Sequence, residues 1–358
     1  KYASISQEIL RAIEKGNEYL KSKQNPEGYW AQPSYPALTA LAVTAYMRDP
    51  ANQGKPVPEY IRKGYDFILK SQKEDGSIFN RGMSSYNTAV CMMALLAANK
   101  EEYAPAILKG RAYLIKQQNH FAPDNPYNGG IGYGDKQAPP IADLSNTSLA
   151  LEAIYYSQKL AKDGKYGEQP DLDWNAATEF INRCQQNPAV NKEPWVSNDK
   201  SQLGGFVYRP GVSSARDKKS AAFDKAEPPK AYGSMTYAGM QSLIYANVDK
   251  NDPRVKLALK WLENSYSLDE NPGMGVQGLY YYYQAMSKAL SAMGIDTLTL
   301  ENGRKVDWRD ELANKLISIQ KSDGSWVNTN NRWWEADPVL VTSYCVLALE
   351  QLYHSIPR

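Results

Sequence analysis

The sequence predicts an all-α protein, a single (α/α)6 barrel (toroid) of six helical hairpins with the apolar helices inside. Three observations support this prediction. A short phrase repeats along the chain, each copy lies in an amphipathic helical pattern, and a more apolar helical segment follows each copy. One such unit cannot bury its apolar face alone, so neighbouring units are expected to pack side by side.

The repeated phrase is Lys-Gly, two residues, an aromatic, an aliphatic, three residues and Gln. It is clearest from Lys15 to Gln24, from Lys63 to Gln72 and from Lys109 to Gln118. More degenerate copies run over residues 176–185, 257–266 and 311–320. Their first residues are 48, 46, 67, 81 and 54 positions apart. The unequal spacing predicts insertions in loops.

The copies of the phrase predict the outer helices. In the second copy Ile61, Tyr65 and Ile68 lie at helical spacing, and the turn at Asp75-Gly76 ends the helix. We expect the Gln of each phrase to hydrogen-bond the backbone end of a neighbouring helix and the aromatic residue to fill the gap between units, because buried polar groups must be paired.

The apolar segments predict the inner helices. The second of them, Tyr86 to Ala98, has almost no polar face and is therefore expected to be buried on both sides. The six predicted inner helices are residues 37–46, 86–98, 146–156, 235–246, 279–293 and 339–353.

Length and charge limit the classes of function. A six-unit ring needs nearly all 358 residues, which predicts one domain over residues 1–358 with a long loop insertion at about 186–232. The 41 basic and 39 acidic residues are evenly mixed, so nucleic acid is not an expected partner. No apolar run approaches the roughly 20 residues of a membrane span, which predicts a soluble protein. The start at Lys1 without Met is compatible with removal of a leader and export, and the compartment stays open.

Cysteine and aromatic usage give two further expectations. Cys91, Cys184 and Cys345 fall inside predicted helices with no CxxC pair, which predicts core thiols. The chain has 26 Tyr and 8 Trp against 6 Phe. Tyrosine joins an apolar ring to a polar tip, so this usage suits a wet cavity with a polar ligand, although most of the tyrosines are expected simply to span helix contacts.

The repeat resembles the QW-type repeat of the squalene-hopene cyclase and protein prenyltransferase superfamily, whose members form α/α toroids. The resemblance covers residues 12–353, and the first three copies match the pattern closely. It implies the fold, whereas function has to be argued from the site.

The resemblance implies a general acid that this chain lacks. Class II terpene cyclases of the superfamily carry Asp-x-Asp-Asp-Thr, and the nearest segment here is Asp143-Leu144-Ser145-Asn146-Thr147. Ser145 stands where the proton-donating Asp would be, and a hydroxyl is too weak an acid to protonate an alkene. Cyclases of this family also place the cavity between two barrels, and this chain has length for one. Protonation-initiated cyclisation is therefore not expected.

The resemblance also implies zinc ligands that are missing. Protein prenyltransferase β subunits hold zinc with Asp-x-Cys and a later His. This chain has no Asp-x-Cys, and His120 in a loop and His354 past the last inner helix have no partners at ligand spacing. The Gly-Cys-Gly-Glu-Gln string of thioester toroids is absent as well. We expect no metal and no cofactor. Glycan hydrolases and lyases on α/α toroids, which use carboxylate pairs or a Tyr, His or Arg base, stay open as an alternative.

A site is expected at the N-termini of the inner helices, where the superfamily gathers its functional groups and helix dipoles favour polar or anionic ligands. A Gly-Gly phrase at residues 129–135 and 204–210 precedes two of these termini. Ser145, Asn146 and Ser234 are either helix caps or ligand contacts. The long charged loop at about 186–232, which we call the fourth loop, is either a solvent-exposed excursion of the chain, a lid or a surface for a protein partner.

The final loop, residues 330–337, is the densest chemical cluster. Trp333 and Trp334 can stack a sugar ring or clamp a polar ligand; equally, they can close the ring against the first unit while Arg332 pairs with Glu335.

The candidate residues follow from these segments. The candidate acids and bases are Asp143, Asp135, Glu335 and Asp337. The candidate ligand contacts are Tyr35, Asn87, Tyr133, Ser145, Asn146, Tyr208, Tyr237, Tyr281, Arg332, Trp333 and Trp334. The sequence thus predicts a terpene cyclase-like or prenyltransferase-like barrel without their hallmark catalytic groups, which binds a small molecule or glycan at the mouth. The alternatives are a glycan-active hydrolase or lyase that uses the mouth carboxylates, and a non-catalytic scaffold for a protein or glycan.

Overall fold

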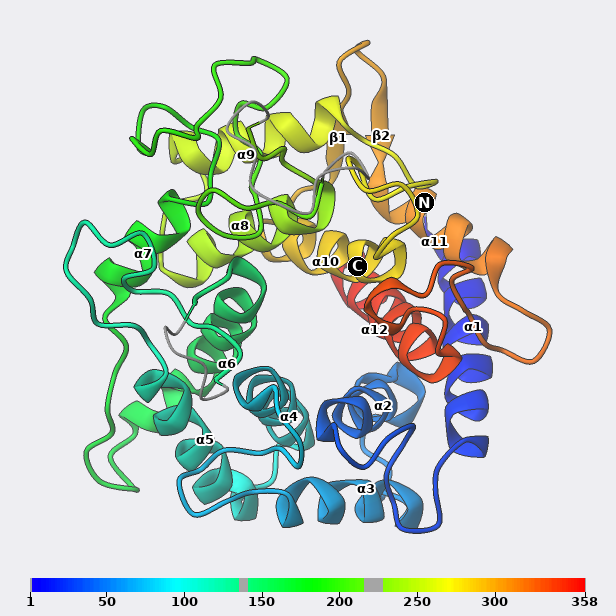
Figure 1. Ribbon diagram of the computed structural model, residues 1–358. Coiled ribbons are helices and arrows are strands. Elements are labelled where there is room, and N and C mark those ends of the chain that lie inside the picture. Colours follow the sequence, from blue (N-terminus) through cyan, green and yellow to red (C-terminus); the bar gives the residue numbers. More distant parts are fainter. Residues whose placement is uncertain (1, 135–140, 216–227, 358) are drawn as a thin grey trace.

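The structure is a computed structural model that describes residues 2–134, 141–215 and 228–357. Its helices form two concentric rings around a central lumen (Figure 1). The inner ring consists of α2 (Pro36–Arg48), α4 (Ser84–Ala98), α6 (Leu144–Lys162), α8 (Gly233–Tyr245), α10 (Leu279–Ala292) and α12 (Pro338–Ser355). The outer ring consists of α1 (Ala3–Ser22), α3 (Glu59–Lys70), α5 (Ala104–Lys116), α7 (Trp174–Asn182), α9 (Pro253–Asn264) and α11 (Trp308–Ile319).

The inner ring is closed. Each inner helix packs on the next one, and α12 packs back on α2 as well as on α1. The predicted (α/α)6 barrel with apolar helices inside is therefore confirmed, and the inner helices begin within a few residues of their predicted starts. The loops of the ring contain three short 3-10 helices, η1 (Pro50–Asn52), η2 (Glu101–Tyr103) and η3 (Arg332–Trp334). They also contain an antiparallel hairpin of β1 (Thr297–Thr299) and β2 (Lys305–Asp307), in which Leu298 is opposite Val306.

The repeated Gln links neighbouring units, as predicted. Its side-chain amide donates to a backbone carbonyl in or next to the following outer helix. The bonds are Gln24 to Tyr60 at 2.7 Å, Gln72 to Ala106 at 2.9 Å, Gln118 to Asp173 at 2.8 Å, Gln185 to Arg254 at 2.9 Å and Gln320 to Ala12 at 3.0 Å. The bond from Gln320 joins the sixth unit to the first. In the fifth unit Tyr266 takes this position and donates to Glu311 at 2.7 Å.

The glycine after each of these Gln residues lies against the backbone of the next unit. Gly129 has φ +81°, and a Cβ added there would lie 2.0 Å from the carbonyl oxygen of Ala176. Gly76 faces the carbonyl of Lys109 and Gly324 that of Lys15 in the same way. The acidic-Gly or Gly-Gly phrase is therefore required by two conditions, a left-handed backbone and a close approach of another chain segment.

A threonine near the start of five inner helices pins the preceding loop. The backbone N–H of Trp30 donates to Thr39 Oγ1 at 2.9 Å, and that of Trp326 donates to Thr342 Oγ1 at 3.0 Å. The same bond recurs at Thr88, Thr147 and Thr236. This contact was not predicted from the sequence, although a threonine recurs in five of the apolar segments. It fixes where each loop meets its inner helix.

Two sequence predictions about single residues need correction. Cys184 lies just beyond α7, which ends at Asn182, and His354 lies inside α12, which continues to Ser355. The prediction of core thiols holds, because Cys91, Cys184 and Cys345 are buried and free. In the part of the chain that the structure describes, none of the helices has the length and apolar character needed to span a bilayer.

A buried carboxyl in α12 makes the stability of the ring depend on pH. Glu350 is fully buried, and neither of its carboxyl oxygens has a hydrogen-bond partner. Burial raises the pKa of Glu350 well above its usual value; the Arg48 guanidinium and the Asn17 side chain oppose this rise, and Asp49 adds to it. Because the folded-state pKa is raised, stability is fully present below the unfolded pKa of about 4.3 and is lost as pH rises toward the folded pKa.

Glu350→Gln is therefore expected to gain stability relative to the parent as pH rises. The two proteins should have similar free energies of unfolding at pH 4, and the variant should be more stable by more than about 1.4 kcal/mol at pH 8, because ionising a carboxyl whose folded-state pKa lies well above its unfolded pKa costs about 1.4 kcal/mol for each pH unit between the two. Urea unfolding of both proteins at several pH values measures the difference. A difference that does not change with pH would contradict a raised pKa at Glu350.

Candidate functional site

A cavity of about 460 Å³ lies at the N-terminal ends of the inner helices, and we call it the mouth cavity. Eight of its 17 lining residues are aromatic, and six of these are tyrosines with polar tips. The lining residues are Met83, Tyr86, Tyr133, Ser145, Asn146, Leu149, Tyr208, Ser214, Tyr232, Ser234, Met235, Tyr281, Trp333, Trp334, Glu335, Leu340 and Tyr344. Of the ligand contacts proposed from the sequence, this set contains Tyr133, Ser145, Asn146, Tyr208, Tyr281, Trp333 and Trp334.

The other proposed ligand contacts lie outside this lining. Asn87 is buried and accepts from the backbone N–H of Ala37 at 3.0 Å, so it joins α2 to α4. Tyr237 is buried against Tyr282, with ring centroids 5.7 Å apart. Tyr35 packs on Trp334 at the rim.

The acid–base candidates are dispersed. Asp337 caps α12 by accepting from the backbone N–H of Val339 at 2.9 Å. Arg332 does not pair with Glu335; its guanidinium donates to Gln277 at 2.6 Å. Asp135 lies outside the described residues. Glu335 lines the mouth cavity, and Asp143 is buried behind the lining residue Asn146, so these two carboxyl groups remain to be considered.

Asp143 caps α6 from the residue before the helix. Its two carboxyl oxygens accept from the backbone N–H of Asn146 at 2.7 Å and from the Asn146 side-chain amide at 2.8 Å. Burial raises the pKa of Asp143 to about 6, against the opposing effect of hydrogen bonds from Asn146 and Tyr208. The caps of α6 and α8 are thus at Asp143 and Tyr232, so Ser145, Asn146 and Ser234 lie inside the helices and are not caps.

Asn146 brings an unused acceptor to the mouth cavity. Its side-chain amide donates to Asp143, while its Oδ1 atom is buried and has no hydrogen-bond partner. Native proteins rarely leave such an atom unpaired, and an unpaired acceptor in a cavity wall is a point where a ligand hydroxyl can bind.

Glu335 caps a helix from another unit. Its carboxylate accepts from the backbone N–H groups of Tyr280 and Tyr281, both at 3.0 Å, and from the Asn328 side-chain amide at 3.0 Å. These are donors at the start of α10, where the helix dipole favours a negative charge. Glu335 is 1% exposed, and burial raises its pKa above the usual value. The sequence could not indicate this role because the acceptor and the helix belong to different units.

Trp333 and Trp334 form an exposed pair at the rim of the mouth cavity. They are 44% and 41% exposed, and their φ angles are +53° and +64°. The Arg332 guanidinium lies 4.4 Å from the Trp333 ring centroid, and the Trp334 ring lies 4.9 Å from that of Tyr35 in the first unit. Left-handed backbone at bulky residues is uncommon and is typical of functional sites. The pair thus contacts the first unit through Trp334 and remains partly exposed at the rim.

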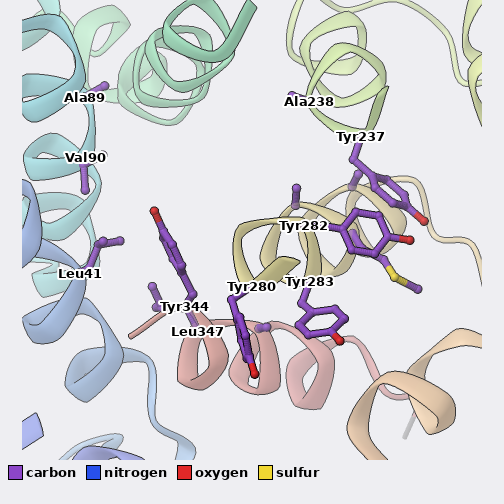
Figure 2. Packing of buried hydrophobic residues seen from close by; sticks show 14 of the residues in the cluster. Leu41, Ala89, Val90, Tyr237, Ala238, Tyr280, Tyr282, Tyr283, Tyr344 and Leu347 are labelled. Carbon is purple, nitrogen blue, oxygen red and sulfur yellow. The ribbon is translucent and has the colours of Figure 1, made fainter. Parts of the chain in front are cut away.

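The floor of the mouth cavity is a layer formed by Tyr86, Leu149, Tyr281 and Tyr344, which also line a second cavity beyond it. Tyr344 projects from α12 into the lumen (Figure 2), with its ring 5.9 Å from that of Tyr281. Burial raises the pKa of Tyr86 to about 12 and those of Tyr281 and Tyr344 as well. The layer therefore presents neutral hydroxyls at physiological pH.

The described part of the long fourth loop folds back onto the mouth. Tyr208, Ser214 and Tyr232 line the cavity, and the carbonyl of Tyr208 accepts from the backbone N–H of Leu144 at 2.7 Å. The described part of the loop is therefore partly packed on the mouth and partly exposed, and the interpretation of the whole loop as a solvent-exposed excursion or a lid stays a prediction. Residues 216–227, which hold most of the loop's charges, lie outside the described residues.

Comparison with known proteins establishes the fold and leaves the activity open. No protein-family model matches the chain. The type II terpene cyclase MstE from Scytonema, solved with geranylgeranyl dihydroxybenzoate, is similar at a TM-score of 0.58 and 10% identity over 99% of this chain and 100% of that one. An inactive variant of an α-1,6-mannanase of Salegentibacter sp. in complex with α-1,6-mannotriose gives 0.58 and 10% over 97% and 100%. Candida albicans protein geranylgeranyltransferase-I with GGPP gives 0.57 and 13% over 96% and 91%.

These similarities confirm an α/α toroid of the kind found in the squalene-hopene cyclase and prenyltransferase superfamily. The barrel is as similar to that of a type II terpene cyclase as to that of a mannanase, and because the alignment spans the whole of that cyclase chain, the length of this chain is no argument against a cyclase. Similarity at this level of identity concerns the fold alone, so the ligand has to be argued from the mouth cavity. Among the described residues, no three His, Cys, Asp or Glu side chains gather as metal ligands would.

Proposed function

We propose that this protein is a carbohydrate-binding α/α barrel that takes a neutral oligosaccharide in the mouth cavity and does not cleave it. The observation that carries the proposal is the exposed, left-handed pair of Trp333 and Trp334 above a wall of tyrosine hydroxyls. The apolar face of a sugar ring can pack on the exposed parts of the indole rings, while its hydroxyls hydrogen-bond to the tyrosine tips and to Asn146 Oδ1.

The state of the two mouth carboxyls supports binding over hydrolysis. A hydrolytic pair needs one acid that holds a proton toward the scissile bond and one carboxylate free to act as base or nucleophile. Both oxygens of Asp143 accept from Asn146, and both oxygens of Glu335 accept from the start of α10. Groups held in this way stabilise helix ends and have little freedom to exchange protons with a substrate.

The hydroxyls set into the mainly apolar lining support a sugar over an isoprenoid. Tyr133, Tyr208 and Tyr232 bring hydroxyls to the wall, together with Ser145 at the position of the cyclase acid. Several of these hydroxyls already bond one another or Asp143, as Tyr208 does with Asp143, Tyr232 with Ser214 and Ser145 with Tyr281. A polyhydroxylated ligand can extend this network, because each hydroxyl can both donate and accept, whereas a hydrocarbon chain cannot.

Trp334→Ala is expected to weaken oligosaccharide binding at least tenfold, which is about 1.4 kcal/mol, because it removes one stacking face. Isothermal titration with α-1,6-mannotriose, cellotriose and maltotriose identifies the best probe for the parent and then measures the variant. Tyr155→Ala is the control, since Tyr155 is 43% exposed against 41% for Trp334 but lies outside the mouth cavity lining. The control should bind like the parent.

The same titrations test the alternatives. Release of new reducing ends during incubation would contradict the non-catalytic part of the proposal and favour a glycan hydrolase. Binding of geranylgeraniol, with no binding of any oligosaccharide at millimolar concentration, would overturn the carbohydrate assignment.

A further inference from the structure

A second cavity of about 550 Å³ lies in the C-terminal half of the lumen, beyond the tyrosine layer. We call it the distal chamber. No site is predicted there from the sequence. Its lining residues recur every three or four positions along each inner helix, as in Gln284 and Lys288 of α10 and Glu152 and Tyr156 of α6. The chamber is therefore built from the inward stripe of all six inner helices and not from loops.

The distal chamber has one wall rich in hydrocarbon and one polar wall. Helices α2, α4 and α12 contribute the hydrocarbon of Leu41, Val90, Met93, Leu96 and Leu347, while Thr44 and Arg48 of α2 and Gln351 of α12 are the polar exceptions on this side. Figure 2 shows Leu41, Ala89 and Val90 on the opposite side of the lumen from Ala238 of α8. Helices α6, α8 and α10 contribute the polar side chains, with Glu152, Tyr156, Gln241, Tyr245, Gln284 and Lys288.

The polar wall is organised around Glu152, which is 7% exposed. Its Oε2 atom accepts from the Lys288 ammonium at 2.5 Å and from the Tyr245 hydroxyl at 3.0 Å. Gln241 donates to the same Tyr245 hydroxyl at 2.5 Å. The network holds Lys288 in place, with its side chain 21% exposed.

Arg48 adds a second cation at the outer end of the chamber. Within the described residues, the hydrogen bond of its guanidinium is the one to Gln351 at 2.7 Å, so further N–H donors remain available. Among the lining residues, Arg48 and Lys288 are opposed by the carboxylate of Glu152, which gives a net charge of +1; the buried carboxyl of Glu350 also interacts with Arg48 from outside the lining. Basic residues at helix C-termini also interact favourably with the helix dipole, and that effect alone would give them a purely structural role.

We propose that the distal chamber is a second ligand site, for a small amphipathic carboxylate. The hydrocarbon part packs on the apolar wall, and the carboxylate binds Arg48 and Lys288 at the polar end. The positive balance of the lining favours a monoanion, and an arginine fork with unused donors matches a carboxylate. The tyrosine layer separates this site from the mouth cavity, so the inference is independent of the carbohydrate proposal.

The test compares ligands with one chain length and three head groups. Decanoate, decanol and decyltrimethylammonium, each below its micellar concentration, are titrated into the full chain by calorimetry. Decanoate is expected to bind at least tenfold more tightly than the other two. Equal binding of decanol would show that the head group is not recognised, and tighter binding of the cation would show that Glu152 and the tyrosine rings dominate; either result overturns the proposal.

Variants locate the site. Arg48→Gln is expected to lower decanoate affinity about tenfold with an unchanged melting temperature, because Arg48 is only partly buried and its bond to Gln351 can be kept by the amide. Lys159→Gln is the matched control, an exposed cation of α6 outside the chamber lining, and should bind like the parent. If Arg332→Gln lowered the affinity and Arg48→Gln did not, the anion would bind at the mouth and the assignment would fail.

Discussion

Gly129→Ala is expected to lower the free energy of unfolding by roughly 3–5 kcal/mol, since the backbone strain and the overpacking each cost about 1–3 kcal/mol. Gly129 has φ +81°, and an added Cβ would lie 2.0 Å from the carbonyl oxygen of Ala176 in the next unit. The obstacle is backbone of α7 and cannot move aside like a flexible side chain. Chemical denaturation monitored by circular dichroism measures the loss.

Gly303→Ala is the matched control for this prediction. Gly303 also has φ +81°, but nothing lies within 4 Å of its added Cβ. Only the cost of the left-handed backbone applies, so we expect a loss of about 1 kcal/mol. The difference between the two variants isolates the contact between units. Equal losses would mean that the repeated glycine serves the turn alone and not the packing of one unit on the next.

Glu335→Ala is expected to lower the free energy of unfolding by roughly 3–5 kcal/mol, because each buried donor left unsatisfied costs about 1–3 kcal/mol. The donors are the backbone N–H groups of Tyr280 and Tyr281 and the amide of Asn328. Glu335→Gln should cost about 1–3 kcal/mol, since its amide group would face one of these N–H donors. Chemical denaturation of both variants provides the values.

Asp337→Ala gives the comparison within the same loop. Asp337 is only partly buried and accepts one capping bond, from Val339, so its loss should cost about 1 kcal/mol. If Glu335→Ala were no worse than Asp337→Ala, the cap on α10 would not be the main role of Glu335. The case for a carboxylate free to act on a substrate would then be stronger, against the binding function proposed for the mouth cavity.

The repeat predicted the architecture because its residues act on backbone at fixed positions. Gln320 reaches the carbonyl of Ala12 with the same geometry by which Gln72 reaches that of Ala106. Main-chain carbonyls do not depend on side-chain identity, so the bond can be anticipated without knowing the neighbouring residue. The repeat predicts nothing about segments that lie outside it. The hairpin of β1 and β2 between α10 and α11 is such a segment and was not predicted.

The candidate site was predicted less completely, for a reason visible in single residues. Trp333, Trp334 and Tyr208 could be placed at the mouth because loops that precede inner helices all open to the same end of the barrel. Tyr237 was expected to contact a ligand in the lumen, but it packs against Tyr282. Which of the two directions its side chain takes depends on its angular position on α8, and the tight packing of the neighbouring helices decides that position. The distal chamber was missed because its polar residues are isolated positions in otherwise apolar helices.

By itself the sequence determined a closed ring of six helical hairpins, because helical periodicity and a repeated contact with backbone are local properties that each unit carries within itself. Only the tertiary structure decided that Glu335 caps α10, that four side chains divide the lumen, and that Glu152 meets Lys288 across the distal chamber. These contacts join side chains from different units. Their existence depends on the rotation of each helix about its axis, which close packing of the whole ring fixes.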